Sequence, residues 1–231
     1  MSQEHRGDNA AQEEMGTNRI EAFSDGVFAI AITLLILDIH VPSEPIPPGK
    51  GTTWLLQQLG LQWPNYLSFF LSFLIVGVVW GNHHTMFSYI KRSNHFLIIL
   101  NLLLLLSIVV IAFTAALLGH YIGTPGQQVA VMIYSGVLVI GGIFYNLLWW
   151  YASRNYNLID KTLQPDVVRR VTRRYLFGPI LYALAFGLSF IWNGTPGLVL
   201  CILLAIIYLL PTVADKIRPH PKDCRDTISR E

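Results

Sequence analysis

Six apolar stretches decide what this chain can fold into. Each runs for about 20 residues, the length that an α-helix needs to cross the hydrocarbon core of a bilayer. They lie at residues 20–39, 65–89, 96–119, 128–152, 175–193 and 196–214. The whole chain is 53% hydrophobic and 13% charged, whereas soluble domains carry about 25% charged residues. The sequence therefore predicts an all-α, polytopic membrane protein with six transmembrane helices.

The positive charges are distributed unevenly between the loops. Of the 16 Lys and Arg residues, 15 fall in alternate segments on one side of the predicted membrane, and only Lys50 falls on the other. Cytoplasmic loops carry the excess of Lys and Arg, so both termini are predicted to be cytoplasmic. The predicted organisation is a cytoplasmic N-terminal segment (1–18), a six-helix membrane domain (19–214) and a cytoplasmic tail (215–231).

Three links between the spans also carry structural signals. The 40–64 link is rich in Pro and Gly, but its second half, 53–62, is predicted to form a short helix at the membrane surface with tryptophan anchors. The 154–174 link is polar and is predicted to continue the neighbouring helices. A tight turn is predicted at 193–196, which would make the last two spans an antiparallel pair.

The first apolar stretch carries an acidic residue, Asp25, in its early turns. A charge in hydrocarbon costs at least ~2.5–3.5 kcal/mol on insertion scales, so this residue indicates a structural or functional role. At about 100° per residue, Ser24, Asp25 and Glu21 lie away from an apolar face. That face carries Arg19, Phe23, Gly26, Ile30, Leu34 and Leu37, with Thr33 beside it. Periodicity leaves two interpretations open: either face could line a path, and both could serve packing alone.

Further polar residues are expected at a similar depth in the second and third spans. Trp80 and His84 are four residues apart and share a helix face, with His83 beside them. Asn101 lies early in the third span, near the same membrane side. We predict a network of Ser24, Asp25, His84 and Asn101. Asn146 in the fourth span is predicted to make an interhelical hydrogen bond.

Enzymatic and metal-binding signatures are absent from the sequence. Adjacent histidines on a helix point about 100° apart, and no third ligand lies near His83 and His84, so no metal site is expected. The chain has no GxSxG, HExxH or phosphate-binding glycine loop, and it has no TVGYG potassium filter. We expect no cofactor and no enzyme activity, although a membrane-embedded enzyme or assembly factor is a third reading.

The main alternative is a proton-coupled secondary transporter that uses Asp25 and His84 as a relay. Six spans without an inverted repeat or Pro-broken half-helices argue against it.

The motif Arg19-x-x-x-Phe23-Ser24-Asp25-Gly26 resembles the opening of the first helix in the family of the lysosomal potassium channel called transmembrane protein 175, which includes prokaryotic relatives. The pattern Trp80-x-x-His83-His84, followed by Asn101-Leu-Leu, is similar to the family's second and third helices. The resemblance is specific over 19–38, weaker over 80–118 and only compositional after about residue 120.

This resemblance implies a potassium-selective channel in the plasma membrane of a prokaryote. It implies a homotetramer in which four copies of the first helix surround the pore and apolar rings replace a carbonyl filter. The constriction and filter positions map onto Ile30, Leu34, Leu37 and Thr33. The residues that hold the pore helices in place map onto Arg19, Phe23, Ser24, Asp25, Gly26, Trp80, His84 and Asn101. The resemblance implies K⁺ as the permeant ion and no bound metal.

Overall fold

Seven α-helices make up nearly all of the part of the chain that the computed structural model describes, residues 4–49 and 51–209. The helices are α1 (Glu4–Leu34), α2 (Gly51–Leu61), α3 (Trp63–Tyr89), α4 (His95–Tyr121), α5 (Gln127–Ser153), α6 (Pro165–Leu188) and α7 (Thr195–Leu209). A 3₁₀ turn, η1 (Leu35–Asp38), ends α1, and two more, η2 (Arg154–Tyr156) and η3 (Trp192–Gly194), lie in later links. The all-α fold predicted from the sequence is confirmed.

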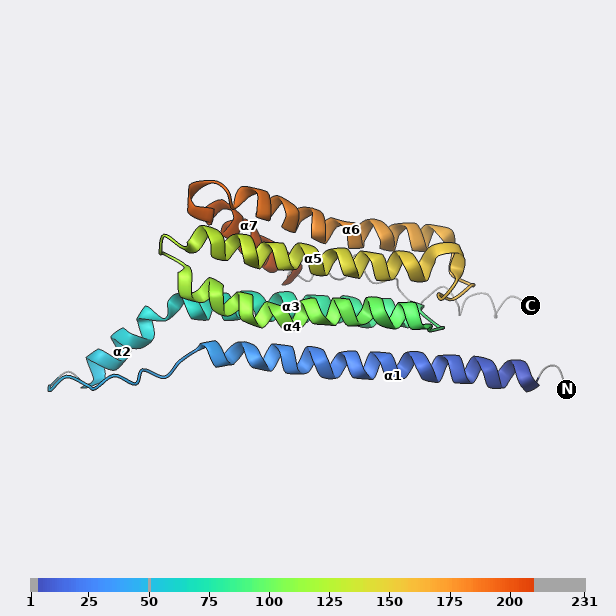
Figure 1. The fold of residues 1–231 in the computed structure, drawn as a ribbon, viewed down its shortest axis with the longest axis horizontal. Coiled ribbons are helices and arrows are strands. Elements are labelled where there is room, and N and C mark those ends of the chain that lie inside the picture. The colour runs from blue at the N-terminus through green and yellow to red at the C-terminus, as the bar shows by residue number, and fades with distance from the viewer. Residues whose placement is uncertain (1–3, 50, 210–231) are drawn as a thin grey trace, which may run out of the picture.

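The long helices run side by side in layers (Figure 1). α1 packs on α3 and α4, α5 packs between α4 and α6, and the short α7 packs against α3, α5 and α6. α1 and α3 run in opposite directions (Figure 1). The N-terminal end of α1, the α3–α4 turn and the α5–α6 turn lie at one end of the bundle. The charge pattern assigned these segments to one membrane side.

Four helices in the described residues are long and apolar enough to cross a membrane: Gly16–Asp38, Trp63–Tyr89, His95–Tyr121 and Gln127–Tyr156. Trp192–Tyr208 is a shorter apolar helix. α6 carries charged residues through its first three turns, which lowers its mean hydropathy. Four of the six predicted spans are therefore clear, and the last two stay a prediction. The end of the sixth stretch and the predicted tail, residues 210–231, lie outside the described residues.

Two predicted helix boundaries differ from the structure. α1 begins at Glu4 and continues through residue 18, so the predicted boundary at 18/19 coincides with no break in the helix. The prediction of a helical link over 154–174 is wrong for its first half, because Asn155 and Tyr156 have φ values of 53° and 54°, in the left-handed region. The second half is helical and begins α6 at Pro165. The short helix predicted over 53–62 is present as α2.

The break in that link allows two turns to bond to each other. The backbone N–H of Lys91 donates to Leu158 O at 2.8 Å, and the N–H of Asp160 donates to Tyr89 O at 3.0 Å. Asp160 in turn accepts from the backbone N–H and the hydroxyl of Thr162, and these donors hold the pKa of its carboxyl below its ordinary value. These bonds tie the α3–α4 turn to the α5–α6 turn and fix one end of the bundle.

Candidate functional site

One face of α1 is left uncovered by the rest of the protomer. The side chains of Ile30 on α1 and of Leu37 on η1, which continues α1, are 61% and 69% exposed, and Phe23 and Leu34 are also exposed. Thr33 lies on the same face, and its hydroxyl donates to Ile30 O at 2.8 Å. The exposed residues are those that the helical spacing grouped on one face. A continuous apolar face of this kind must be covered by lipid or by another copy of the chain.

The opposite face of α1 packs into the bundle. Ser24, Phe28, Ala31 and Leu35 are buried at intervals of three or four residues, which places them on one side of the helix. Phe28 packs against the ring of His83 at a centroid distance of 5.4 Å. The packing of this face fixes the rotation of α1, and therefore it decides which residues remain on the uncovered side.

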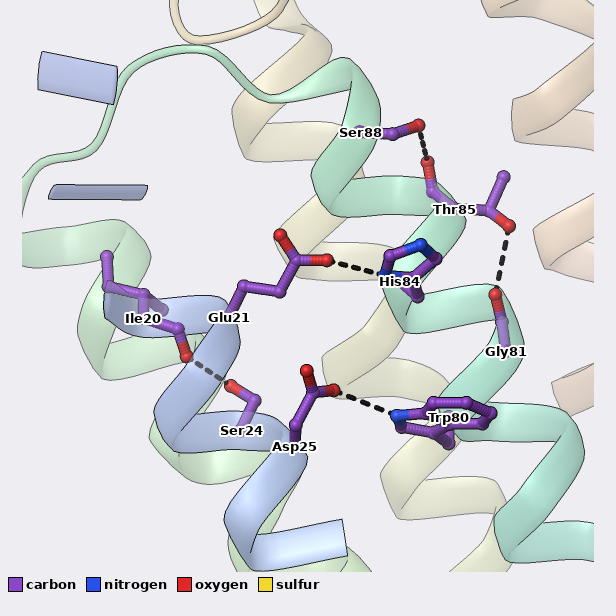
Figure 2. Close-up of polar contacts among 9 residues, drawn as sticks. All are labelled: Ile20, Glu21, Ser24, Asp25, Trp80, Gly81, His84, Thr85 and Ser88. Carbon is purple, nitrogen blue, oxygen red and sulfur yellow. Dashed lines mark hydrogen bonds and ion pairs between the residues drawn. The ribbon is translucent and has the colours of Figure 1, made fainter. Parts of the chain in front are cut away.

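Two acidic residues of α1 are paired with side chains of α3 (Figure 2). Trp80 Nε1–H donates to Asp25 Oδ1 at 2.8 Å, and Glu21 Oε1 lies 2.7 Å from His84 Nδ1. Glu21 and Asp25 are one turn apart on α1, as Trp80 and His84 are on α3. Both carboxylates therefore point toward α3 and away from the exposed apolar face.

A second polar cluster is buried between α1, α3 and α4. Asn101 Nδ2 donates to Ser24 Oγ at 2.9 Å, and Ser24 donates onward to Ile20 O at 2.8 Å. His83 Nε2 lies 2.9 Å from Asn101 Oδ1. Because an amide oxygen can only accept, Nε2 must carry a proton. His83 Nδ1 is buried without a partner in the described residues, which fits the neutral tautomer with its single proton on Nε2.

The predicted network of Ser24, Asp25, His84 and Asn101 is therefore corrected. His83, not His84, bonds to Asn101, while His84 pairs with Glu21. His83 is fully buried and stacks on Phe87 at 4.5 Å between ring centroids. Adjacent residues on a helix point about 100° apart, so only one histidine could face the core. The buried positions Ser72, Val76 and Phe87 are in helical phase with His83, and this spacing could have identified it.

Glu21 was the main residue that the sequence reasoning missed. It was placed on the far side of α1 from the apolar stripe, but no partner was assigned to it. In an antiparallel helix pair, moving one turn forward on α1 matches moving one turn back on α3. Once Asp25 is paired with Trp80, the same geometry pairs Glu21 with His84. That relationship could have been found from the sequence spacing.

The other motif residues on α1 face outward. Phe23 is 56% exposed, Arg19 is exposed, and a Cβ added at Gly26 would meet nothing within 4 Å. Among the described residues, Arg19 has no hydrogen bond or ion pair. The motif is thus divided: Ser24 and Asp25 bond within the protomer, while the other three positions lie on the uncovered face.

Asn146 makes the interhelical bond that was predicted for it. Its Nδ2 donates to Tyr175 O on α6 at 3.0 Å and to Gly142 O on its own helix at 2.8 Å.

The comparison with known proteins identifies relatives over most of the chain. The family model "Endosomal/lysosomal potassium channel TMEM175" matches residues 19–111. A potassium channel of Chamaesiphon minutus is 42% identical over 202 residues, which are 87% of this chain and 97% of that protein. A potassium channel of Streptomyces collinus is 41% identical over 176 residues, 76% of this chain and 83% of that protein.

A solved structure supports the same relationship. The crystal structure of a lysosomal potassium-selective channel TMEM175 homolog from Chamaesiphon minutus superimposes with a TM-score of 0.75 at 40% sequence identity. The match covers 86% of this chain and 98% of that one.

Proposed function

The chain belongs to the TMEM175 family of potassium channels, and we propose that it conducts K⁺ through a pore lined by the exposed face of α1 in a homotetramer. The proposed assembly lies in the plasma membrane of a prokaryote, with six spans per protomer and both termini in the cytoplasm. The single observation that carries the pore assignment is the uncovered stripe of Ile30, Leu34 and Leu37 on the helix that bears the family motif.

The distribution of polar groups on α1 supports this choice of face. Asp25 and Glu21 are held by Trp80 and His84, so they are directed toward the bundle. If the acidic face lined the water column, these carboxylates would have to leave their partners on α3. A central axis facing Ile30 requires no such rearrangement. The exposed Arg19, Phe23 and Gly26 then become available for contacts between neighbouring copies of α1.

An apolar ring selects ions through the cost of removing their water. A bare cation between isoleucine and leucine side chains has no ligand, so it must keep its water or pay for dehydration. K⁺ holds its water less tightly than Na⁺ and is hindered less. The Thr33 hydroxyl uses its hydrogen on Ile30 O, which leaves its oxygen able to accept from water or to contact a cation. We therefore propose a modest K⁺ preference, weaker than that of a carbonyl filter.

The transporter alternative receives no support from the contacts of its two residues. Asp25 bonds Trp80 and His84 pairs with Glu21, so the described residues contain no direct Asp25–His84 contact that would serve as a relay.

Electrical recording tests the proposed function directly. Purified protein in planar bilayers should give unitary currents. With K⁺ on one side of the bilayer and Na⁺ on the other, the reversal potential should follow the K⁺ gradient. Slow, saturable flux without unitary events would indicate a transporter and would refute the channel assignment. Cross-linking and mass measurement of the detergent-solubilised protein should give a tetramer, and a stable monomer or dimer would refute the proposed pore.

A further inference from the structure

A half-open cavity of about 100 Å³ lies in the bundle, away from α1. Its walls come from α3, α4, α5, α6 and α7. α3 and α6 both flank it, and a hydrogen bond from Arg174 Nη2 to Asn82 Oδ1 at 3.0 Å connects them at one end. None of the residues assigned to the pore or its supporting contacts lines this cavity. Its role must therefore be sought separately from conduction.

The cavity is polar at one end and mainly apolar at the other, as the antiparallel order of the helices requires. Asn82 on α3, Asn146 on α5 and Arg174 on α6 lie toward the end that holds the α3–α4 and α5–α6 turns. Ile111 and Leu138 lie toward the opposite end. A molecule that fills this space must therefore combine one polar group with an apolar body.

The amides at the polar end define the chemistry of that polar group. Asn146 uses its Nδ2 on two backbone carbonyls, which fixes the amide orientation and leaves Oδ1 as an acceptor. Asn82 uses its Oδ1 on Arg174, which leaves its Nδ2 as a donor. Neither remaining atom has a hydrogen-bond partner among the described residues. The two amides therefore present one acceptor and one donor.

A hydroxyl group matches this pair in chemistry, because it can both donate to an acceptor such as Asn146 Oδ1 and accept from a donor such as Asn82 Nδ2. We propose that the cavity binds a small neutral amphiphile, an alcohol with a short apolar body, taken from the membrane phase. A cavity of roughly 150 Å³ accepts benzene, so this one suits a molecule no larger than a short-chain alcohol. A carboxylate or phosphate head could not donate to Asn146 Oδ1, and an ammonium head would lie near Arg174, so the lining favours a neutral hydroxyl.

Glycines on the walls provide a specific way to close the cavity. A Cβ at Gly178 would meet nothing closer than Tyr208 Oη at 3.7 Å, an ordinary contact distance. A Cβ at Gly142 would lie 2.7 Å from Pro179 Cβ, so that position is unsuitable. Gly178→Leu should reduce the space, because the cavity wall accommodates its Cβ at an ordinary contact distance. Gly187, on the same helix but outside the cavity, has nothing within 4 Å of an added Cβ and supplies the matched control Gly187→Leu.

Photolabelling in lipid nanodiscs tests the proposal on the full chain. A diazirine-bearing butanol should label residues of the cavity, and 1-butanol should compete for this labelling. At equal concentrations in the membrane, diethyl ether and pentane should compete roughly tenfold less well, because they lose one or both hydrogen bonds. Gly178→Leu should abolish cavity labelling, and Gly187→Leu should retain it.

Two results would overturn the proposal. Labelling spread over lipid-facing residues and unchanged in Gly178→Leu would show that no specific site exists. Equal competition by the alcohol, the ether and the alkane would show that the amides do not recognise a hydroxyl, and this comparison on the wild-type protein decides the matter even if Gly178→Leu fails to fold.

Discussion

Trp80 and Asp25 join α3 to α1 through an indole-to-carboxylate hydrogen bond of 2.8 Å. One turn forward on α3 and one turn back on α1, His84 pairs with Glu21 (Figure 2). The two contacts lie one helical turn apart and join the antiparallel helices α1 and α3. They hold Glu21 and Asp25 against α3, and they leave the apolar face of α1 uncovered within the protomer.

Loss of the Asp25 carboxylate should weaken the placement of α1. Asp25→Ala removes the acceptor for Trp80 Nε1–H and should cost about 1–2 kcal/mol of protomer stability, with a lower tetramer fraction. Asp25→Asn keeps an acceptor oxygen and should lie close to wild type. Size-exclusion chromatography with light scattering measures the tetramer fraction. A stable, fully tetrameric Asp25→Ala protein would contradict this role.

Substitution of Ile30 should alter permeation without altering the fold. Ile30 is 61% exposed and contributes little to the packing of its own protomer, so Ile30→Asn should fold normally. Four amides in place of four isoleucines should wet the constriction, raise the unitary current and reduce the preference for K⁺ over Na⁺. Single-channel recording under opposed K⁺ and Na⁺ gradients measures both quantities. If conductance and reversal potential stay as in wild type, Ile30 does not line the pore.

The buried cluster of Ser24, Asn101 and His83 should contribute to stability. Asn101→Leu leaves His83 Nε2–H without its acceptor in a buried site, which should cost about 1–3 kcal/mol. Thermal unfolding of the detergent-solubilised protein should show a lower midpoint. Leu102→Ala, at an exposed neighbouring position on α4, is the control and should shift the midpoint much less. Equal midpoints for the two variants would argue that the cluster is not stabilising.

The crossing of α6 and α7 should tolerate no side chain at Gly197. A Cβ there would lie 2.6 Å from Ala185 O and 3.1 Å from the Ser189 backbone, so Gly197→Ala must push the helices apart. Overpacking of this kind costs about 1–3 kcal/mol. Gly187→Ala meets nothing within 4 Å and should leave stability unchanged or slightly higher. The thermal midpoints of the two proteins give the comparison, and a neutral Gly197→Ala would show that this contact is not tight.

Much of the candidate site could be predicted because it depends on spacing within single helices. The spacing of Ile30, Leu34 and Leu37 places them on one common face, and the same angles direct Asp25 away from that face. The choice between His83 and His84 could not be made in this way. Both histidines are chemically identical, and only the packing of α3 against Phe28 and Asn101 decides which ring is buried.

The helical link over 154–164 was predicted wrongly for a related reason. Its polar composition is compatible with a helix, but bonds to the α3–α4 turn stabilise the left-handed backbone at Asn155 and Tyr156 instead. Likewise, the cavity flanked by α3 and α6 involves side chains from five helices, and no pattern within a single helix indicates where such a space is left.

The sequence by itself determined the all-α membrane class of this protein, the grouping of residues on the faces of its first span and the family motif. These features depend on hydropathy and helical periodicity, which can be read within short segments of the chain. The tertiary structure decided which histidine joins the buried cluster, which partner holds each acid and which face of α1 stays uncovered. Those outcomes depend on how helices distant in sequence rotate and pack against one another, and side-chain packing between helices is set by the whole bundle.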